Sequence, residues 1–418
     1  MDQVVVVGGG LGGLAAAALI GRAGRRVVVV ERARALGGRA QTHDEDGFLM
    51  NLGAHALYRG GAAADVYREL GVNYTGRSPV TVGLAIRGGR GHALPTGPMS
   101  LFFGDLMPVA ARFEAAKLFA GLATIEAPPG MSVLEWAEAT TRHVTVKEMF
   151  LALARVTTYA NAPTLQDAAK TARQLALAMR AGVLYLDGGW ATLVEGLRRA
   201  AKHGGAEIVT GRDVVQVLHD DRVHGVVLDD GRTIAATEVI VTGGPRGVSA
   251  LTKSAAVKRW AETLVPAHAA CLDIAVSHLP RAKLNFALGI DTPLYVSVHS
   301  VTARLAPAGG ALIHAAKYLP AGSSEHQDND KVLAEIEGAV DLLQPGWRDV
   351  VVHRRFLPRL VVTHAIDVAE ARPGPAVPDV HGLYVVGDWV GGTGALSDAT
   401  LASAREAASL VGARRAAA

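Results

Sequence analysis

Cysteine, aromatic residues and long apolar runs are scarce in this chain. Cys271 is the only cysteine among 418 residues, which excludes an internal disulfide and suits a reducing compartment, so a cytoplasmic location is expected. No apolar run reaches the roughly 18–20 residues that a bilayer-spanning helix needs. An apolar, strand-like run begins almost at Met1, so no signal peptide is expected. These features argue against secreted and membrane-spanning classes of protein.

A large charge of one sign is missing as well. The 42 basic and 39 acidic residues leave a net charge of +3, and no basic run is interleaved with aromatic side chains. A nucleic-acid partner is therefore not expected. Neither a metal-ligand spacing nor a Ser–His–Asp arrangement stands out. Half of the residues are hydrophobic, and the length allows two or three domain-sized units with a substantial core.

Two apolar strands flank a glycine-rich turn in the first forty residues. Residues 4–7 are all valine and run into the glycine-rich segment 8–13, an alanine-rich stretch follows, and a second valine run at 27–30 ends at Glu31. The order strand, turn, helix, strand and carboxylate is typical of a dinucleotide site, in which the carboxylate accepts hydrogen bonds from a ribose.

The glycine spacing explains how such a site works. Gly8 allows a tight turn, Gly10 lets the backbone approach a pyrophosphate, and Gly13 lets the helix pack closely on the strand. The unpaired N–H groups at the helix start face the phosphates. The residues predicted to bind the dinucleotide here are Gly8, Gly10, Leu11, Gly12, Gly13, Glu31 and Arg32.

A second glycine pair, Gly37-Gly38, precedes Arg39 just after the acidic strand end. This segment resembles the paired-glycine segment of the flavin amine oxidase and phytoene desaturase superfamily. The resemblance implies that Gly38 and Arg39 lie beside the pyrophosphate of FAD, where the guanidinium can pair with a phosphate.

The C-terminal segment carries a second part of the same resemblance. A strand at 383–386 ends in Gly387-Asp388, and a helix is expected from Leu396 to about residue 408. In the superfamily, an acidic residue at this place holds the flavin ribityl chain, and the N–H at the helix start faces the pyrimidine end of the ring. The resemblance therefore assigns Gly387, Asp388 and Leu396 to the cofactor, whereas Asp398 is expected to be a first-turn charge.

The middle of the chain predicts a small antiparallel meander. Residues 214–219 and 223–228 alternate apolar and polar side chains, and turn residues separate them. The superfamily has such a meander, and the backbone of its first strand meets the adenine. Val214 is the matching position.

These segments together predict an α/β fold: a Rossmann-like, GR2-type FAD-binding domain with a β-meander, plus an α+β substrate domain of mixed sheet and helices. The FAD-binding domain is expected to comprise residues 1–60, 183–250 and 345–418, and the substrate domain residues 61–182 and 251–344. FAD is expected to be non-covalent, because the anchoring cysteine of some relatives is missing near the C-terminus. Further helices are expected at 131–142, 164–179 and 328–343, and strands at 271–276, 294–298 and 311–315.

The segment 99–122 is the most lipid-like part of the sequence. A helix packed on the substrate domain is the favoured interpretation, because polar residues give it an ordinary hydrophilic face. Peripheral membrane contact through this segment is the alternative.

Residues typical of amine oxidases are absent from the matching positions. Ala395 stands where an aromatic residue of amine oxidases forms part of a cage around the amine, and Ala270 stands near the place of a lysine that many amine oxidases carry. Small residues at the reactive face suit an apolar, bulky or extended substrate. Histidine moves protons at neutral pH, so His55 and His364 are the catalytic candidates, although a structural His55 bonded to backbone is the alternative. The residues predicted to contact substrate are Tyr58, Arg59, Trp389 and Ala395.

The leading hypothesis is an FAD-dependent dehydrogenase, desaturase or oxidase that transfers hydride from a carbon of an apolar small molecule to flavin N5. Oxygen or another acceptor would then take the electrons. Gly387-Asp388-Trp389 departs from the carotenoid desaturase pattern, which makes carotenoid itself a doubtful substrate. The alternatives are a flavin amine or amino-acid oxidase, a lipid-binding protein like the Rab GDP-dissociation inhibitors, and a flavoprotein that keeps FAD only as structure.

Overall fold

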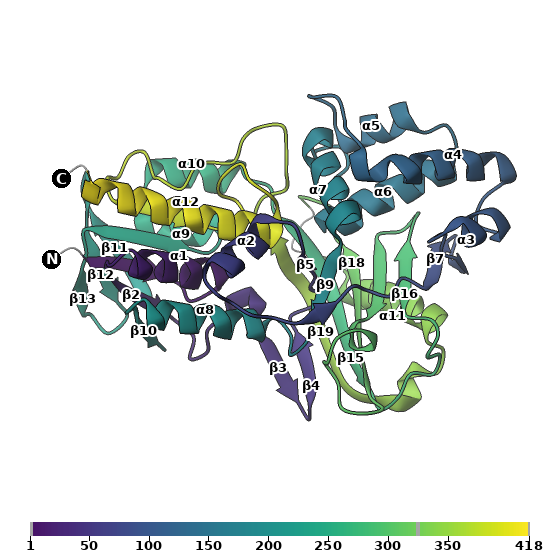
Figure 1. The fold of residues 1–418 in the computed structure, drawn as a ribbon, viewed down its shortest axis with the longest axis horizontal. Coiled ribbons are helices and arrows are strands. Elements are labelled where there is room, and N and C mark those ends of the chain that lie inside the picture. The colour runs from purple at the N-terminus through teal and green to yellow at the C-terminus, as the bar shows by residue number, and fades with distance from the viewer. Residues whose placement is uncertain (1–2, 323–326, 417–418) are drawn as a thin grey trace.

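A five-stranded parallel sheet lies at the centre of one half of the molecule (Figure 1). The computed structural model describes residues 3–322 and 327–416. Within these residues the strand order is β10, β2, β1, β14, β20, and all neighbouring strands are parallel. Valine-rich runs suit these strands, because a parallel sheet covered on both faces is apolar throughout. The bounds are Gln3–Val7 (β1), Arg26–Glu31 (β2), Glu207–Thr210 (β10), Glu238–Thr242 (β14) and Leu383–Val386 (β20).

Helices cover one face of this sheet. α1 packs between α8 and α12, and α2 packs on α12. Figure 1 shows α1, α8 and α12 running alongside one another in the same half as both chain ends. The alanines of α1 are fully buried, which lets the neighbouring helices approach closely. The bounds are Leu11–Arg22 (α1), Ala62–Glu69 (α2), Ala191–His203 (α8) and Leu396–Ala416 (α12).

A three-stranded antiparallel meander covers the other face. It consists of β11 (Val214–His219), β12 (Val223–Leu228) and β13 (Thr233–Ala235), so the first two strands have the bounds expected from sequence. Valines of β1 and β2 share a core with valines of β11 and β12. α9 (Pro245–Thr252) packs beside the meander, and α10 (Ala255–Thr263) packs on α9. The predicted Rossmann-like sheet with a β-meander is therefore confirmed.

A seven-stranded mixed sheet forms the other half of the molecule (Figure 1). Its order is β19, β15, β18, β17, β16, β7, β8, and α11 covers one face. β15, β17, β18 and α11 lie close to the positions expected from sequence. The bounds are Gly83–Arg87 (β7), Arg90–Ala93 (β8), Ala267–Val276 (β15), Phe286–Gly289 (β16), Leu294–Val298 (β17), Ala311–Tyr318 (β18), Asn329–Leu343 (α11) and Val351–Thr363 (β19).

Smaller elements link the two halves. The hairpin β3–β4 projects from the molecule in Figure 1, and β5, β9 and β6 form a short three-stranded sheet. A helical group packs above the seven-stranded sheet. The bounds are Thr42–Glu45 (β3), Phe48–Asn51 (β4), Leu57–Tyr58 (β5), Gly76–Arg77 (β6), Val183–Leu186 (β9), Pro98–Phe103 (α3), Val109–Gly121 (α4), Val133–Thr140 (α5), Val144–Thr158 (α6) and Ala168–Ala181 (α7), with short 3-10 helices at Gly38–Ala40, Leu122–Thr124, His299–Val301 and Trp347–Val350.

Three segments differ from the sequence-based division. β19 pairs with β15 in the seven-stranded sheet, although residues 345–418 were assigned to the FAD-binding domain. β7 and β8 add a hairpin to the first insert, which was expected to be mainly helical, and α6 was not foreseen. Strand pairing between distant segments is a tertiary property, so the local pattern of 351–363 does not reveal its partner.

The lipid-like segment 99–122 folds into most of α3, all of α4 and the start of a 3-10 turn. Ala111 and Ala115 are buried against the neighbouring core, as the packed-helix interpretation predicts. Met99, Phe103 and Phe113 are nevertheless 73%, 81% and 64% exposed. Membrane contact through this segment stays a prediction. In the described part of the chain, no helix combines the length and apolar character required to cross a bilayer.

Candidate functional site

A cavity of about 770 Å³ lies between the two halves of the molecule. One side of its wall comes from the carboxyl ends of the parallel strands and the loops that follow them. The other side comes from one face of the seven-stranded sheet and the loop after β4. The carboxyl ends of parallel strands are where open α/β sheets bind ligands. The cavity is therefore placed to hold a nucleotide at one side and a second molecule at the other.

The glycine turn after β1 has the geometry that its spacing predicts. Gly8 has φ +104°, and a Cβ there would lie 2.2 Å from Thr242 Oγ1. A Cβ on Gly13 would lie 1.9 Å from the Gly8 carbonyl oxygen, so only glycine permits this approach of helix to strand. At Gly10 the nearest atom to a Cβ is 3.8 Å away, the Gly37 carbonyl oxygen. The turn is thus tight behind the cavity and open toward it.

The second glycine pair lies against the first. The Gly37 N–H donates to the Gly9 carbonyl at 2.9 Å, and Gly37 and Gly38 have φ of +113° and +54°. α1 starts between these two loops, with no acidic residue in its first turn. The N–H groups of the first turn have no partner within the helix, which makes this position suited to a phosphate.

Glu31 ends β2 at the edge of the cavity. Its carboxylate accepts the Gly9 N–H at 2.6 Å and the Ala33 N–H at 2.9 Å, which fixes it beside the glycine turn. Arg32 also lines the cavity here, and Val214 lines it from the start of the meander. Glu31, Arg32 and Val214 therefore lie close together at one end of the cavity. This is the arrangement that a binding site for the adenosine half of a dinucleotide requires.

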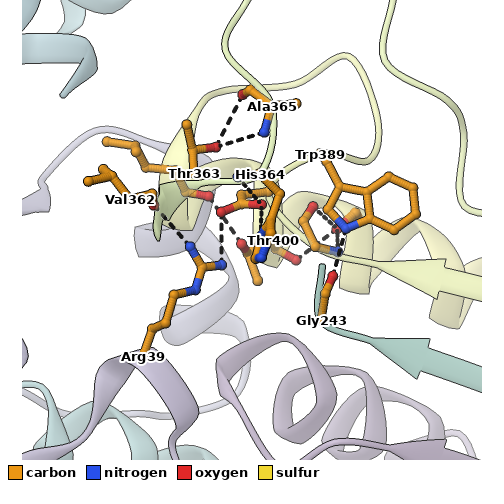
Figure 2. A network of polar contacts seen from close by, with 12 residues as sticks. Arg39, Gly243, Val362, Thr363, His364, Ala365, Trp389 and Thr400 are labelled. Atoms are coloured by element: carbon orange, nitrogen blue, oxygen red, sulfur yellow. Dashed lines mark hydrogen bonds and ion pairs between the residues drawn. The ribbon is translucent and has the colours of Figure 1, made fainter. Parts of the chain in front are cut away.

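Asp388 is the centre of a polar network between the two ends of the chain. Figure 2 shows Arg39, Val362 and His364 of this network from close by. Its carboxylate pairs with the Arg39 guanidinium at 2.8 Å and accepts hydrogen bonds from the His364 backbone N–H at 3.2 Å and from His364 Nδ1 at 3.0 Å. Arg39 also donates to the Val362 carbonyl at 2.9 Å. Burial opposes the charged carboxylate, but Arg39 and His364 outweigh it and hold the pKa of Asp388 below its ordinary value.

Leu396 begins α12 with φ +55°, a left-handed conformation that leucine rarely adopts. Such strain is maintained where the surrounding structure requires a particular backbone direction, often at a ligand. Leu396 lines the cavity near Gly387 and Asp388.

The open cradle at Gly10, the helix start and the strained Leu396 fit a bound flavin dinucleotide. The predicted cofactor residues in the wall are Gly8, Gly10, Leu11, Gly12, Glu31, Arg32, Gly38, Arg39, Val214, Gly387, Asp388 and Leu396, whereas Gly13 supports the turn from behind.

The two catalytic candidates both line the cavity but differ in environment. His55 Nδ1 lies 3.0 Å from the Gly53 carbonyl, and the His55 ring contacts Trp190 edge to face at 4.8 Å. Burial lowers the pKa of His55 to about 4, so its imidazole is neutral at pH 7. This is the backbone-bonded arrangement of the structural interpretation. His364 is directed at Asp388 and belongs to the network around the predicted ribityl site.

The four residues predicted to contact substrate do not lie in the cavity wall. The Tyr58 hydroxyl is buried and donates to the Thr157 carbonyl at 2.6 Å, and Arg59 is exposed on the surface. Trp389 is fully buried and donates from Nε1 to the Gly243 carbonyl at 2.7 Å, in the core under the meander. Ala395 is buried just before α12, and its neighbours Leu396 and Ser397 reach the wall instead. These residues lie close in sequence to cavity residues, but successive side chains point in different directions, so their own side chains do not reach the wall.

Sequence reasoning missed the residues of the sheet wall. Ala269, Cys271, Tyr295, Ala316 and Tyr318 line the cavity from three adjacent strands, and Tyr159 lines it from the end of α6. Ala270, the residue matched to the family lysine, has its side chain in the core under α11, on the opposite face from this wall. β17 is buried throughout, and β18 is buried apart from Lys317, so their burial gives no alternation that would reveal the cavity face.

Comparison with known proteins agrees with this geometry. The model of the flavin containing amine oxidoreductases matches residues 11–411. A 57-residue segment is 46% identical to all-trans-retinol 13,14-reductase of Macaca fascicularis and covers 14% of this chain and 9% of that protein. A 71-residue segment is 45% identical to phytoene dehydrogenase of Streptomyces griseus and covers 17% of this chain and 14% of that protein.

The matched segments are thus a small fraction of both relatives. An oxidoreductase structure from Methanosarcina mazei shares the fold over nearly the whole length, with a TM-score of 0.78, 23% identity, and coverage of 96% of this chain and 99% of that one. The predicted superfamily and fold class are therefore confirmed. The chain belongs to the family of flavin containing amine oxidoreductases.

Proposed function

We propose that this protein binds FAD non-covalently and is a dehydrogenase, desaturase or oxidase of an apolar, bulky or extended small molecule. The observation that carries the proposal is a single cavity that joins a dinucleotide cradle to a wall of small and aromatic side chains. A bound flavin would supply the redox chemistry, accepting hydride from a substrate carbon at N5 and releasing the electrons to oxygen or another acceptor.

The chain's own residues would bind and orient the two molecules. The loops at Gly10 and Gly38, the helix start at Leu11, and Glu31 would hold the adenosine diphosphate half. Asp388 and the N–H at Leu396 would hold the flavin half. His55 and His364 remain the candidates for proton transfer beside the reacting atoms.

The charge of the wall favours an apolar substrate over an amine. The acidic residues that line the cavity are Glu31, Asp213 and Asp388, and all of them follow strands or precede the meander in the FAD-binding half. In the described residues, the charged side chain that lines the side formed by the seven-stranded sheet is Arg359, and no carboxylate or lysine lines it. A protonated amine would lose its hydration there without gaining a counter-charge. Retinol reductase and phytoene dehydrogenase, named for polyene substrates, are in keeping with this preference.

A flavin amine or amino-acid oxidase is the second candidate, and the description of the matching family favours it. A non-catalytic lipid-binding role is less consistent with the chain, because the phosphate-site glycines, Arg39 and Asp388 are all present in the cavity wall.

The test is the visible spectrum of the purified protein, followed by anaerobic mixing with polyenes, isoprenoids and amines. We expect released FAD to be identified chromatographically and the flavin absorbance to bleach with an apolar compound. Bleaching with amines and release of peroxide would support the second candidate. A colourless protein that cannot be reconstituted with FAD would contradict both.

A further inference from the structure

The loop of residues 387–395 connects β20 to α12 and is rich in glycine. It contains Gly391, Gly392 and Gly394, and two of these, Gly391 and Gly394, have φ of +77° and +67°. Glycine loses more conformational freedom on folding than any other residue. A loop of this composition therefore needs contacts from other segments to hold a single conformation.

Arg372 supplies three of these contacts. It lies in the segment between β19 and β20, and its side chain is only 6% exposed. Its Nη1 donates to the Asp388 carbonyl at 2.9 Å, its Nε to the Gly391 carbonyl at 2.9 Å, and its Nη2 to the Gly394 carbonyl at 2.5 Å. A guanidinium is planar and rigid, so it fixes the three carbonyls relative to one another. One side chain thus joins the beginning, the middle and the end of the loop.

The segment that carries Arg372 is itself anchored. Asp367 Oδ1 lies 3.8 Å from Arg372 Nη1, and the Asp367 side chain is 15% exposed, so the guanidinium has a counter-charge beside it. The Asp367 carbonyl accepts the Asp167 N–H at 2.8 Å, and the Pro373 carbonyl accepts the Gly391 N–H at 2.7 Å. The loop therefore rests on a segment that has contacts of its own.

The restrained loop leads into two residues of the cavity wall. Asp388 and Leu396 line the cavity, whereas Arg372 does not. Arg372 bonds the backbone of Asp388, and the Asp388 carboxylate pairs with Arg39 and His364. Leu396 comes two residues after the Gly394 carbonyl and has φ +55°, a conformation that surrounding contacts must maintain. The effect of Arg372 on this side of the cavity is therefore exerted through the loop.

We propose that Arg372 is a positioning residue for the flavin half of the cofactor site. Its three hydrogen bonds hold the loop 387–395 so that Asp388 and Leu396 occupy the cavity wall before a ligand binds, which reduces the ordering that binding requires. The inference rests on the proposed function in one respect, that the cavity binds FAD. Lysine is not an equivalent residue here, because an ammonium is a point charge on a flexible stem.

The test measures the binding of FAD and of ADP to the full chain, freed of bound flavin, by isothermal titration calorimetry. ADP is the half of FAD that the glycine turn and Glu31 would hold, so its binding does not depend on the loop. We expect Arg372→Lys to weaken FAD binding about tenfold, because charge-assisted hydrogen bonds are lost, and to change ADP binding less than about twofold. Arg198→Lys is the matched control and should leave both unchanged, because Arg198 makes two 2.6 Å hydrogen bonds to Glu195 outside the cavity wall.

Amide hydrogen exchange of the ligand-free protein is the second measurement. We expect Arg372→Lys to speed exchange in residues 387–396 and to leave the glycine turn at 8–13 unchanged. A defect of the whole fold would speed exchange in both segments. The comparison therefore separates a local clamp from general destabilisation.

Equal losses of FAD and ADP binding in Arg372→Lys, wild-type binding of FAD by this variant, or unchanged exchange in the loop would overturn the proposal. If Arg372→Lys does not fold, Asp367→Asn serves instead, because it removes the counter-charge and keeps the guanidinium. A loss of FAD binding of about two- to fivefold with ADP unchanged is then expected, and wild-type FAD binding would overturn the proposal. A wild-type chain that does not bind FAD would contradict the proposed function together with this inference, whereas a deficit missing only from the variants contradicts the inference alone.

Discussion

At the scale of single residues, Asp388 connects the two ends of the chain at the predicted flavin site. Its side chain is almost fully buried, yet it accepts from Arg39 and His364 and keeps its charge. Removing a buried carboxylate leaves its cationic partner without a counter-charge, which costs more than the loss of an exposed ion pair.

Asp388→Asn is therefore expected to weaken FAD affinity about tenfold or more, because charge-assisted hydrogen bonds are lost. The measurement is the dissociation constant from flavin fluorescence, together with the fraction of FAD retained after gel filtration. Asp379→Asn is the control, since Asp379 accepts from Ser254 and Ala256 outside the cavity. Wild-type retention by the Asp388 variant would remove Asp388 from the cofactor site.

At the scale of elements, Asp398 joins the starts of two helices. It lies in the first turn of α12, and its Oδ1 accepts the Ala63 N–H at the start of α2 at 2.7 Å. Oδ2 has no partner in the described residues, and a Cβ on Gly61 would lie only 2.1 Å from it. Asp398, expected only as a charge in the first turn of α12, thus connects α12 to α2 through a hydrogen bond. The spacing of the sequence did not indicate this contact.

Burial raises the pKa of Asp398 from 3.8 to about 6. Because the folded-state pKa is the higher one, this group favours folding most below pH 3.8, and that contribution is lost as the pH rises through about 6. Asp398→Asn should therefore be more stable than wild type at pH 8, by up to about 3 kcal/mol, and the gain should disappear near pH 4. Urea unfolding at both pH values measures it, with Asp330→Asn, an exposed first-turn aspartate of α11, as control. The same gain at both pH values would refute this account.

At the scale of the whole molecule, the cavity is shared by two halves with separate cores. The parallel sheet has its own apolar clusters on both faces, and the seven-stranded sheet has another under α11. A ligand in the cavity contacts both halves and stabilises the folded state by mass action.

Stripping FAD should therefore lower the thermal unfolding temperature by several degrees, and adding it back at about 100 times its dissociation constant should restore about 2.7 kcal/mol. FMN is the matched control, because it lacks the adenosine half that the glycine turn and Glu31 would hold. The expected order is FAD above FMN above apoprotein, by differential scanning fluorimetry. Identical unfolding temperatures with FMN and FAD would contradict adenosine binding at the glycine turn.

Local sequence patterns were sufficient to predict the half of the molecule that contains the parallel sheet. Local requirements explain the residue types at Gly8, Gly13, Glu31 and the two valine strands. A left-handed turn, a close approach of helix to strand and an all-buried strand each admit few residue types. Their order along the chain was enough to identify the fold class and the family.

The residues on the sheet side of the cavity could not be predicted from local sequence patterns. Tyr295 and Tyr318 come from strands that are buried almost throughout, so no polar alternation marks the face that turns to the cavity. β19 joins β15, and Arg39 meets Asp388, through contacts between segments far apart in the sequence. Such contacts depend on how the two sheets are placed relative to each other, and a local sequence pattern carries no information about that placement.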